Sequence, residues 1–244
     1  MTVVEHLVEL RRRLVFSGLA FILLSTIAFF FYEPILRFVQ APLCDLDPEL
    51  LGPQGCRLVF NKVFGGFMFR LKMTALVGLI VSMPVWLYQL FAFIVPGLTS
   101  KERRYAVPFV ISSVFLFLVG SFLAYLTMPT GIRILIAIAG PELVPLLGAE
   151  EYLSFVGLMF LGFGLLFELP LVLFFLGLAE VVSVEQLRRQ RKAAFVGIVA
   201  LSAIVTPSQD PYTMLVLAVP IYLLYELTIF ILKIVMRRRA QEKT

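Results

Sequence analysis

Charged side chains are scarce in this sequence. Only 15% of its 244 residues are Asp, Glu, Lys or Arg, whereas 60% are hydrophobic. Soluble domains usually carry about 25% charged residues, and a soluble fold of this size could not bury so much apolar surface. The shortage of charge therefore argues against a soluble globular domain and indicates that lipid is the solvent.

Side chains that do catalytic or metal chemistry are equally scarce. His6 is the only histidine, and the sequence has neither a metal-ligand cluster nor a nucleophile–base pair. It also lacks the Gly-x-x-x-x-Gly-Lys-Ser/Thr motif that cradles nucleotide phosphates. We therefore expect no enzyme activity, no metal or other cofactor and no nucleic-acid partner.

Long runs with few or no charges predict about six membrane-spanning helices, since a bilayer core needs about 20 apolar residues in helical form. Prolines within the runs are compatible with this, because neighbouring helices can satisfy the freed backbone groups. The sequence thus predicts an all-α, polytopic membrane bundle in one domain, residues 1–244, with its last two helices short. The expected parts are an amphipathic start at 1–13, spans near 14–32, 73–96, 105–128, 152–179, 193–207 and 211–232, and a tail at 233–244.

The positive charges predict the orientation of these spans. Of the 21 Lys and Arg residues, 15 fall at the N-terminus, in the second and fourth connections and in the tail. Cytoplasmic segments carry the excess of Lys and Arg in membrane proteins. We therefore expect both termini to be cytoplasmic.

Two cysteines, Cys44 and Cys56, fall in the first outside connection. An oxidising compartment permits a disulfide there. The sequence is compatible with a bonded pair and with two free thiols.

Acidic residues stand among the cytoplasmic cations. Glu9 lies in the amphipathic start beside three arginines, and Glu102 follows the second span beside Lys101, Arg103 and Arg104. One interpretation is local charge balance, with Glu9 paired to Arg13 at i+4 or to Arg12 at i+3. The other is a pair of carboxylates at one membrane face that bind a cationic partner.

A single carboxyl group, Glu168, lies near the middle of the span 152–179. A charged group at that depth is costly unless it is protonated, paired or hydrated, so it is a candidate functional residue. Pro170 follows closely and frees the carbonyl of Leu166, which favours a kink. An alternative function is a proton- or cation-coupled secondary transporter using Glu168, although no internal repeat supports it.

A series of short motifs runs in order along most of the chain, and together they resemble the TatC family. TatC is the multispanning receptor subunit of the twin-arginine protein translocase. The motifs are His6-Leu7-Val8-Glu9-Leu10-Arg11, Ala41-Pro42-Leu43, Phe93-Ile94-Val95-Pro96-Gly97-Leu98 with Glu102-Arg103-Arg104, Phe163-Gly164-Leu165-Leu166-Phe167-Glu168-Leu169-Pro170, Thr206-Pro207, Ala218-Val219-Pro220-Ile221-Tyr222 and Glu226.

The resemblance implies a glove-shaped, six-helix receptor and core subunit in the bacterial cytoplasmic (inner) membrane. It would bind Arg-Arg signal peptides of folded proteins at the cytoplasmic face and organise their export. The residues implied for signal-peptide binding are Glu9, Glu102, Phe93, Arg11 and Arg104.

The resemblance also implies an intramembrane pocket and partner subunits. Glu168 and Pro170 would lie in the pocket. Single-span TatA/TatB-type subunits would dock along the fifth and sixth helices, and the receptor would contact lipid and self-associate. The docking residues would be Thr206, Thr213, Met214 and Glu226, with Thr213 and Met214 standing where many relatives have a glutamine.

Overall fold

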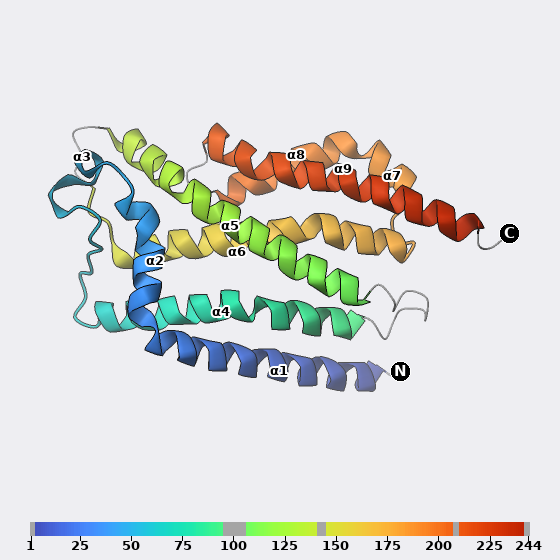
Figure 1. Cartoon of the computed structure of the whole chain (residues 1–244), viewed down its shortest axis with the longest axis horizontal. Helices are drawn as coiled ribbons and strands as arrows, with labels where there is room; N and C mark the ends of the chain where they lie inside the picture. Colours follow the sequence, from blue (N-terminus) through green and yellow to red (C-terminus); the bar gives the residue numbers. More distant parts are fainter. Residues whose placement is uncertain (1–2, 95–105, 141–144, 207–209, 242–244) are drawn as a thin grey trace.

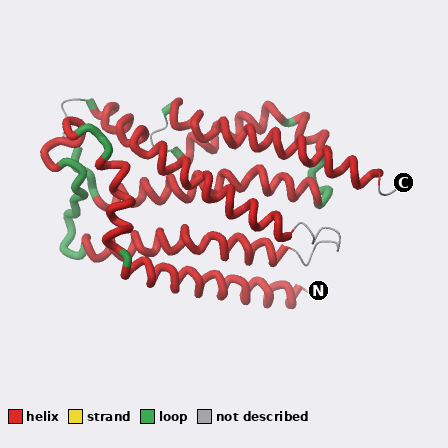
Figure 2. The backbone as a smooth tube through the Cα atoms, in the orientation of Figure 1, coloured by secondary structure: helices red, strands yellow, loops and turns green. Residues whose placement is uncertain are grey.

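The computed structural model of the chain describes residues 3–94, 106–140, 145–206 and 210–241. Figure 2 shows that this part is almost entirely helical, with its longest loop at one end of the bundle. The all-α fold expected from the sequence is therefore confirmed. Its helices are α1 (Val3–Phe30), α2 (Tyr32–Cys44), α3 (Pro48–Leu51), the 3-10 helix η1 (Gly52–Gln54), α4 (Gly65–Ile94), α5 (Ala106–Ala139), α6 (Ala149–Leu178), α7 (Val184–Arg189), α8 (Arg191–Val205) and α9 (Pro211–Gln241).

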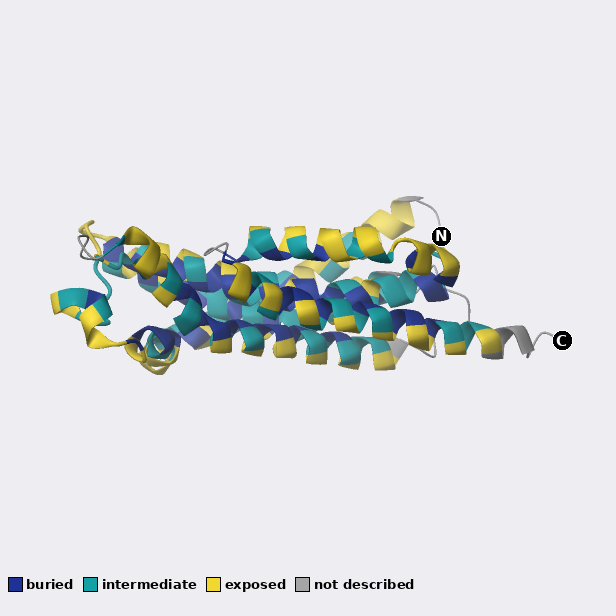
Figure 3. Cartoon of the chain, turned by 90° about the horizontal axis from the view of Figure 1, so that it is seen from above, coloured by how far each residue is buried: buried dark blue, intermediate teal, exposed yellow. Residues whose placement is uncertain are grey.

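Five of the described helices, α1, α4, α5, α6 and α9, are long and apolar enough to cross a membrane. Helix α8 has only 15 residues, or about 22 Å of helix against a hydrocarbon core of about 30 Å. It runs alongside α9, and both ends of the chain lie at the same end of the bundle (Figures 1 and 3). Helix α8, the fifth of these six helices in chain order, is thus a short member of the bundle that returns the chain to the other end.

Several helices extend beyond the predicted spans. The start, expected as a surface helix at 1–13, is continuous with the first span in α1. The sixth helix is not short, because α9 has 31 residues and runs past the apolar stretch to Gln241. Helix α4 begins at Gly65 and α5 ends at Ala139, outside the uncharged runs. Lys, Arg, Glu and Gln are good helix formers, so charge ends an apolar run without ending a helix.

Neighbouring helices pack closely where small residues face each other. Helix α1 packs mainly on α4, α5 packs on α6, and α9 packs on both α6 and α8. Gly78 of α4 lies directly against the backbone of Ser25 of α1, and Gly120 of α5 lies against the carbonyl of Phe163 of α6. A Cβ at either glycine would overlap these atoms, so both positions require glycine for the observed approach.

A cap of short elements covers the end of the bundle opposite the termini (Figure 1). Helix α2 crosses this end, and the hydroxyl of Tyr152 in α6 donates a 2.6 Å hydrogen bond to the carbonyl of Val39 in α2. Cys44 and Cys56 form a disulfide with their Cα atoms 5.0 Å apart. A short bridge pairs Val59 with Gly148 and ties the connection to the start of α6.

Candidate functional site

Glu9 holds an arginine of its own helix at the end of the bundle that carries the termini. Arg13 donates from Nε at 3.1 Å and from Nη2 at 2.5 Å to the same oxygen, Glu9 Oε1. Arg13 Nη1 also donates to Gln89 Oε1 of α4 at 3.2 Å. The i+4 pairing anticipated from the spacing is therefore present, and it joins α1 to α4.

The second carboxylate oxygen of Glu9, Oε2, is not used in the contact with Arg13. Oε2 is buried, and no donor among the described residues reaches it. A buried acceptor without a partner costs about 1–3 kcal/mol, more when it is charged. The carboxylate lines an open cavity of about 550 Å³ between α1 and α4, together with Glu5, Arg12, Arg13 and Gln89. The site can therefore accept a further cationic donor.

Phe93, expected at this site from the sequence, lies close to the start of the chain. Its ring stacks on His6 with the centroids 4.2 Å apart, which joins the end of α4 to the start of α1. Arg11 is exposed on α1. Glu102 and Arg104 lie outside the described residues, so the structure does not place them relative to Glu9.

Glu168 is buried in the bundle between α6 and α5, with 7% of its surface exposed. The hydroxyl of Ser113 in α5 donates a 2.6 Å hydrogen bond to Glu168 Oε2. Oε1 has no hydrogen-bond partner in the part of the chain that the structure describes. Two residues on, the carbonyl of Pro170 accepts a 3.1 Å hydrogen bond from Thr228 of α9. This segment thus brings three helices together at polar contacts inside the apolar core.

Two of the predicted docking residues face inward. Thr206 is 1% exposed and Thr213 is 0% exposed. Thr206 donates to the carbonyl of Ser202. The backbone N–H of Thr213 donates to Asp210 at 2.8 Å, a capping contact at the start of α9. Both residues therefore make local contacts at helix ends, and their role in partner docking stays a prediction.

Glu226 is also engaged within the chain. It accepts a 2.6 Å charged hydrogen bond from Arg191 of α8 and a 3.2 Å one from Tyr222. This ion pair joins α8 to α9. Met214 is half-exposed on α9 and is available for contact.

The structure reveals residues that sequence reasoning missed. Ser113 and Arg191 each contact a predicted glutamate from a neighbouring helix, and Gln89 of α4 accepts from Arg13, the arginine that Glu9 binds. None stands within a helical turn of its partner, so spacing alone could not find them. An exposed apolar stripe on α9 was also overlooked, although its spacing of three to four residues was visible in the sequence. It comprises Tyr212, Leu215, Val219, Leu223, Leu227 and Phe230.

The long apolar helices and the charged pocket at one end define a multi-pass α-helical membrane protein. A family model described as "Sec-independent protein translocase protein (TatC)" matches residues 5–220. The chain therefore belongs to the TatC family, a family of protein translocase components rather than enzymes.

Relatives cover nearly the whole chain. The TatC proteins of Frankia casuarinae and Corynebacterium kroppenstedtii are 43% and 37% identical over 95% and 99% of it. The chain spans 65% and 63% of the lengths of these two relatives. The Aquifex aeolicus TatC is 34% identical over 99% of the chain and 98% of its own length.

A crystal structure of the twin-arginine translocase receptor TatC in DDM is also similar. It matches with a TM-score of 0.75 and 35% identity over 93% of this chain and 98% of that one. The arrangement of helices described above is thus that of a solved TatC receptor.

Proposed function

We propose that this chain is the signal-peptide receptor and core subunit of a twin-arginine translocase. The observation that carries the proposal is the Glu9 carboxylate, which binds the guanidinium of Arg13 through one oxygen and keeps a second, buried oxygen that no described residue contacts by a hydrogen bond. The receptor assignment replaces the secondary-transporter alternative, whose only support was Glu168.

Arginine recognition follows from the geometry of the acceptor. A carboxylate accepts two parallel hydrogen bonds from the planar guanidinium fork. A lysine ammonium is a point charge and cannot reproduce that pairing. Glu9, together with Glu102, would hold the two arginines of the signal peptide, and the His6–Phe93 stack would form an apolar wall beside them.

The proposed setting is the bacterial cytoplasmic membrane with both termini in the cytoplasm. The support is the excess of Lys and Arg at the end of the bundle that carries the termini. Single-span TatA/TatB-type subunits would pack on the exposed apolar stripe of α9, beside the short helix α8. Further copies of the receptor would complete the assembly.

The test is peptide binding to the full chain in lipid nanodiscs. Wild type, Glu9→Gln, Glu102→Gln and the double variant are compared on Arg-Arg and Lys-Lys signal peptides. Each single change should weaken Arg-Arg binding about tenfold, since a charged hydrogen bond contributes about 1.5 kcal/mol or more and 1.4 kcal/mol is a factor of ten. Replacing the Arg-Arg peptide by the Lys-Lys peptide should lower the binding affinity of wild type more than that of the double variant.

Glu5→Gln is the matched control, because it removes one negative charge from the same pocket and the same helix. It should change affinity much less than Glu9→Gln. An Arg-over-Lys preference that is unchanged in the double variant would place recognition elsewhere and leave both glutamates with a role in charge balance.

A further inference from the structure

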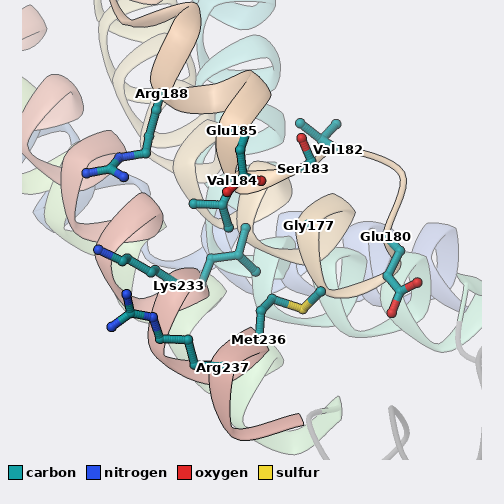
Figure 4. A pocket seen from close by; sticks show the side chains of 11 residues that line it. Gly177, Glu180, Val182, Ser183, Val184, Glu185, Arg188, Lys233, Met236 and Arg237 are labelled. Carbon is teal, nitrogen blue, oxygen red and sulfur yellow. The ribbon is translucent and has the colours of Figure 1, made fainter. Parts of the chain in front are cut away.

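A second charged cavity, of about 650 Å³, lies where the end of α6, helix α7 and the last turns of α9 meet. It is separate from the Glu9 pocket, which lies between α1 and α4. Three cations line it: Arg188 from α7, and Lys233 and Arg237 from α9. In Figure 4 these three side chains extend to the same side of the pocket.

These cations lack acidic partners in the described structure. Within residues 3–94, 106–140, 145–206 and 210–241, ion pairs form at Arg13, Lys72 and Arg191 only. Two acids also line the cavity, but Glu180 extends from the opposite side (Figure 4), and Glu185 forms no ion pair with any residue that the structure describes. Lys233 and Arg237 are one turn apart on α9, and like charges at that spacing repel each other. An anion bound between the two cations would be attracted to both, and this attraction would offset their mutual repulsion.

Apart from these charged residues and Ser183, the cavity is lined by apolar side chains and Gly177. Its floor includes Leu232, which is fully buried, Val184, which is 9% exposed, and Met236. Lys233 is the first charged residue after the apolar stretch of α9, so the cavity lies where a membrane interface would be. A ligand that fits carries a negative group for the cations and an apolar portion for the floor.

We propose that this cavity binds the phosphate headgroup of an anionic phospholipid from the inner leaflet. Basic pockets between transmembrane helices on the cytoplasmic side are suited to such headgroups. The cations hold the phosphate, and the apolar floor receives the glycerol and the first methylenes of the acyl chains. The proposal rests on the cytoplasmic orientation of the proposed function, but not on signal-peptide recognition.

The test measures retained lipid on the full chain by native mass spectrometry, after extraction from membranes that mix phosphatidylglycerol with phosphatidylcholine. Wild type is compared with Lys233→Gln/Arg237→Gln. A control, Arg189→Gln/Lys192→Gln, removes two exposed cations of the same region that do not line the cavity. We expect the first variant to retain about tenfold less phosphatidylglycerol than wild type, or less still. Retention by the control should fall less than twofold. The double variant Lys233→Arg/Arg237→Lys, which keeps both positive charges, should retain as much phosphatidylglycerol as wild type.

Three results would overturn the proposal. They are equal loss in the two charge-removing variants, equal retention of phosphatidylglycerol and phosphatidylcholine by wild type, and displacement of the lipid by millimolar inorganic phosphate, which would indicate a free-phosphate site. Arg-Arg peptide binding should be unchanged in Lys233→Gln/Arg237→Gln. A failed lipid experiment with normal peptide binding therefore leaves the receptor function intact.

Discussion

Arg13 occupies the carboxylate that we assign to the signal peptide, so replacing it should strengthen peptide binding. An incoming arginine must either displace Arg13 from Glu9 Oε1 or share the carboxylate with it. In Arg13→Gln, the carboxylate is free before the peptide arrives. We therefore expect tighter binding of an Arg-Arg peptide to Arg13→Gln than to wild type.

The magnitude follows from the contact. Hydrogen bonds to charged groups contribute about 1.5–3 kcal/mol, but exposed ion pairs contribute about 0–1 kcal/mol. The side chains of Arg13 and Glu9 are 23% and 19% exposed, which places the pair between these limits, at about 1 kcal/mol. Loss of that competition should raise the affinity about fivefold.

The assay is titration of the labelled peptide against nanodisc-embedded protein at two salt concentrations. Arg12→Gln is the control, because it removes the same charge from the same cavity while Arg12 itself lies over the ring of Phe16. That variant should raise Arg-Arg and Lys-Lys binding equally and only at low salt. Arg13→Gln should increase the affinity for the Arg-Arg peptide more than that for the Lys-Lys peptide, and it should do so at both salt concentrations. Weaker Arg-Arg binding by Arg13→Gln would refute the reasoning and show that Arg13 holds the carboxylate in position.

Three further predictions concern the rest of the molecule. Glu168→Gln should transport nearly as well as wild type and Glu168→Leu much less, because Gln still accepts from Ser113; equal transport by Glu168→Leu would show that the polar group is dispensable. Non-reducing mass spectrometry should find the Cys44–Cys56 pair, whose loop contributes about 3 kcal/mol to local stability, and two alkylated thiols would contradict it. Glu180 has a φ of +59°, a backbone conformation that costs a non-glycine residue about 1 kcal/mol. Glu180→Gly should therefore stabilise the folded protein by about 1 kcal/mol and raise its melting temperature in detergent. An unchanged melting temperature would mean that contacts of the Glu180 side chain offset the backbone cost.

The sequence predicted the all-α membrane fold class because lipid imposes a simple rule on composition. A run without charges long enough to cross the bilayer is visible without knowing any contact. Helix ends were predicted less well, since α9 continues past Lys233 although the apolar run does not. Helical hydrogen bonds, unlike burial, do not require apolar side chains.

The candidate site was only partly predictable for a different reason. The Glu9–Arg13 pair is local, so the i+4 spacing was enough to propose it. The contact of Arg13 with Gln89 joins residues 76 positions apart, and it depends on how α1 packs against α4. Thr213 is a different case, because its position was taken from the resemblance as a partner contact, and the structure adds that its backbone N–H and hydroxyl donate to Asp210, which caps the start of α9.

The positive net charge of the chain opposes the binding of cationic peptides, so a receptor for them needs local acidic groups. A chain of formal charge +5 repels such peptides on average, and most of its cations lie at the end where the peptide would bind. Screening limits this repulsion to about 8 Å at physiological salt, so affinity depends on what lies within that distance of the peptide's arginines. At Glu9 this is a carboxylate with one oxygen that accepts no hydrogen bond from the described residues. At the α7–α9 cavity it is three cations, which an anionic headgroup would neutralise. Selectivity for arginine therefore depends on the local geometry of a few carboxylates, and it is compatible with a strongly basic cytoplasmic face.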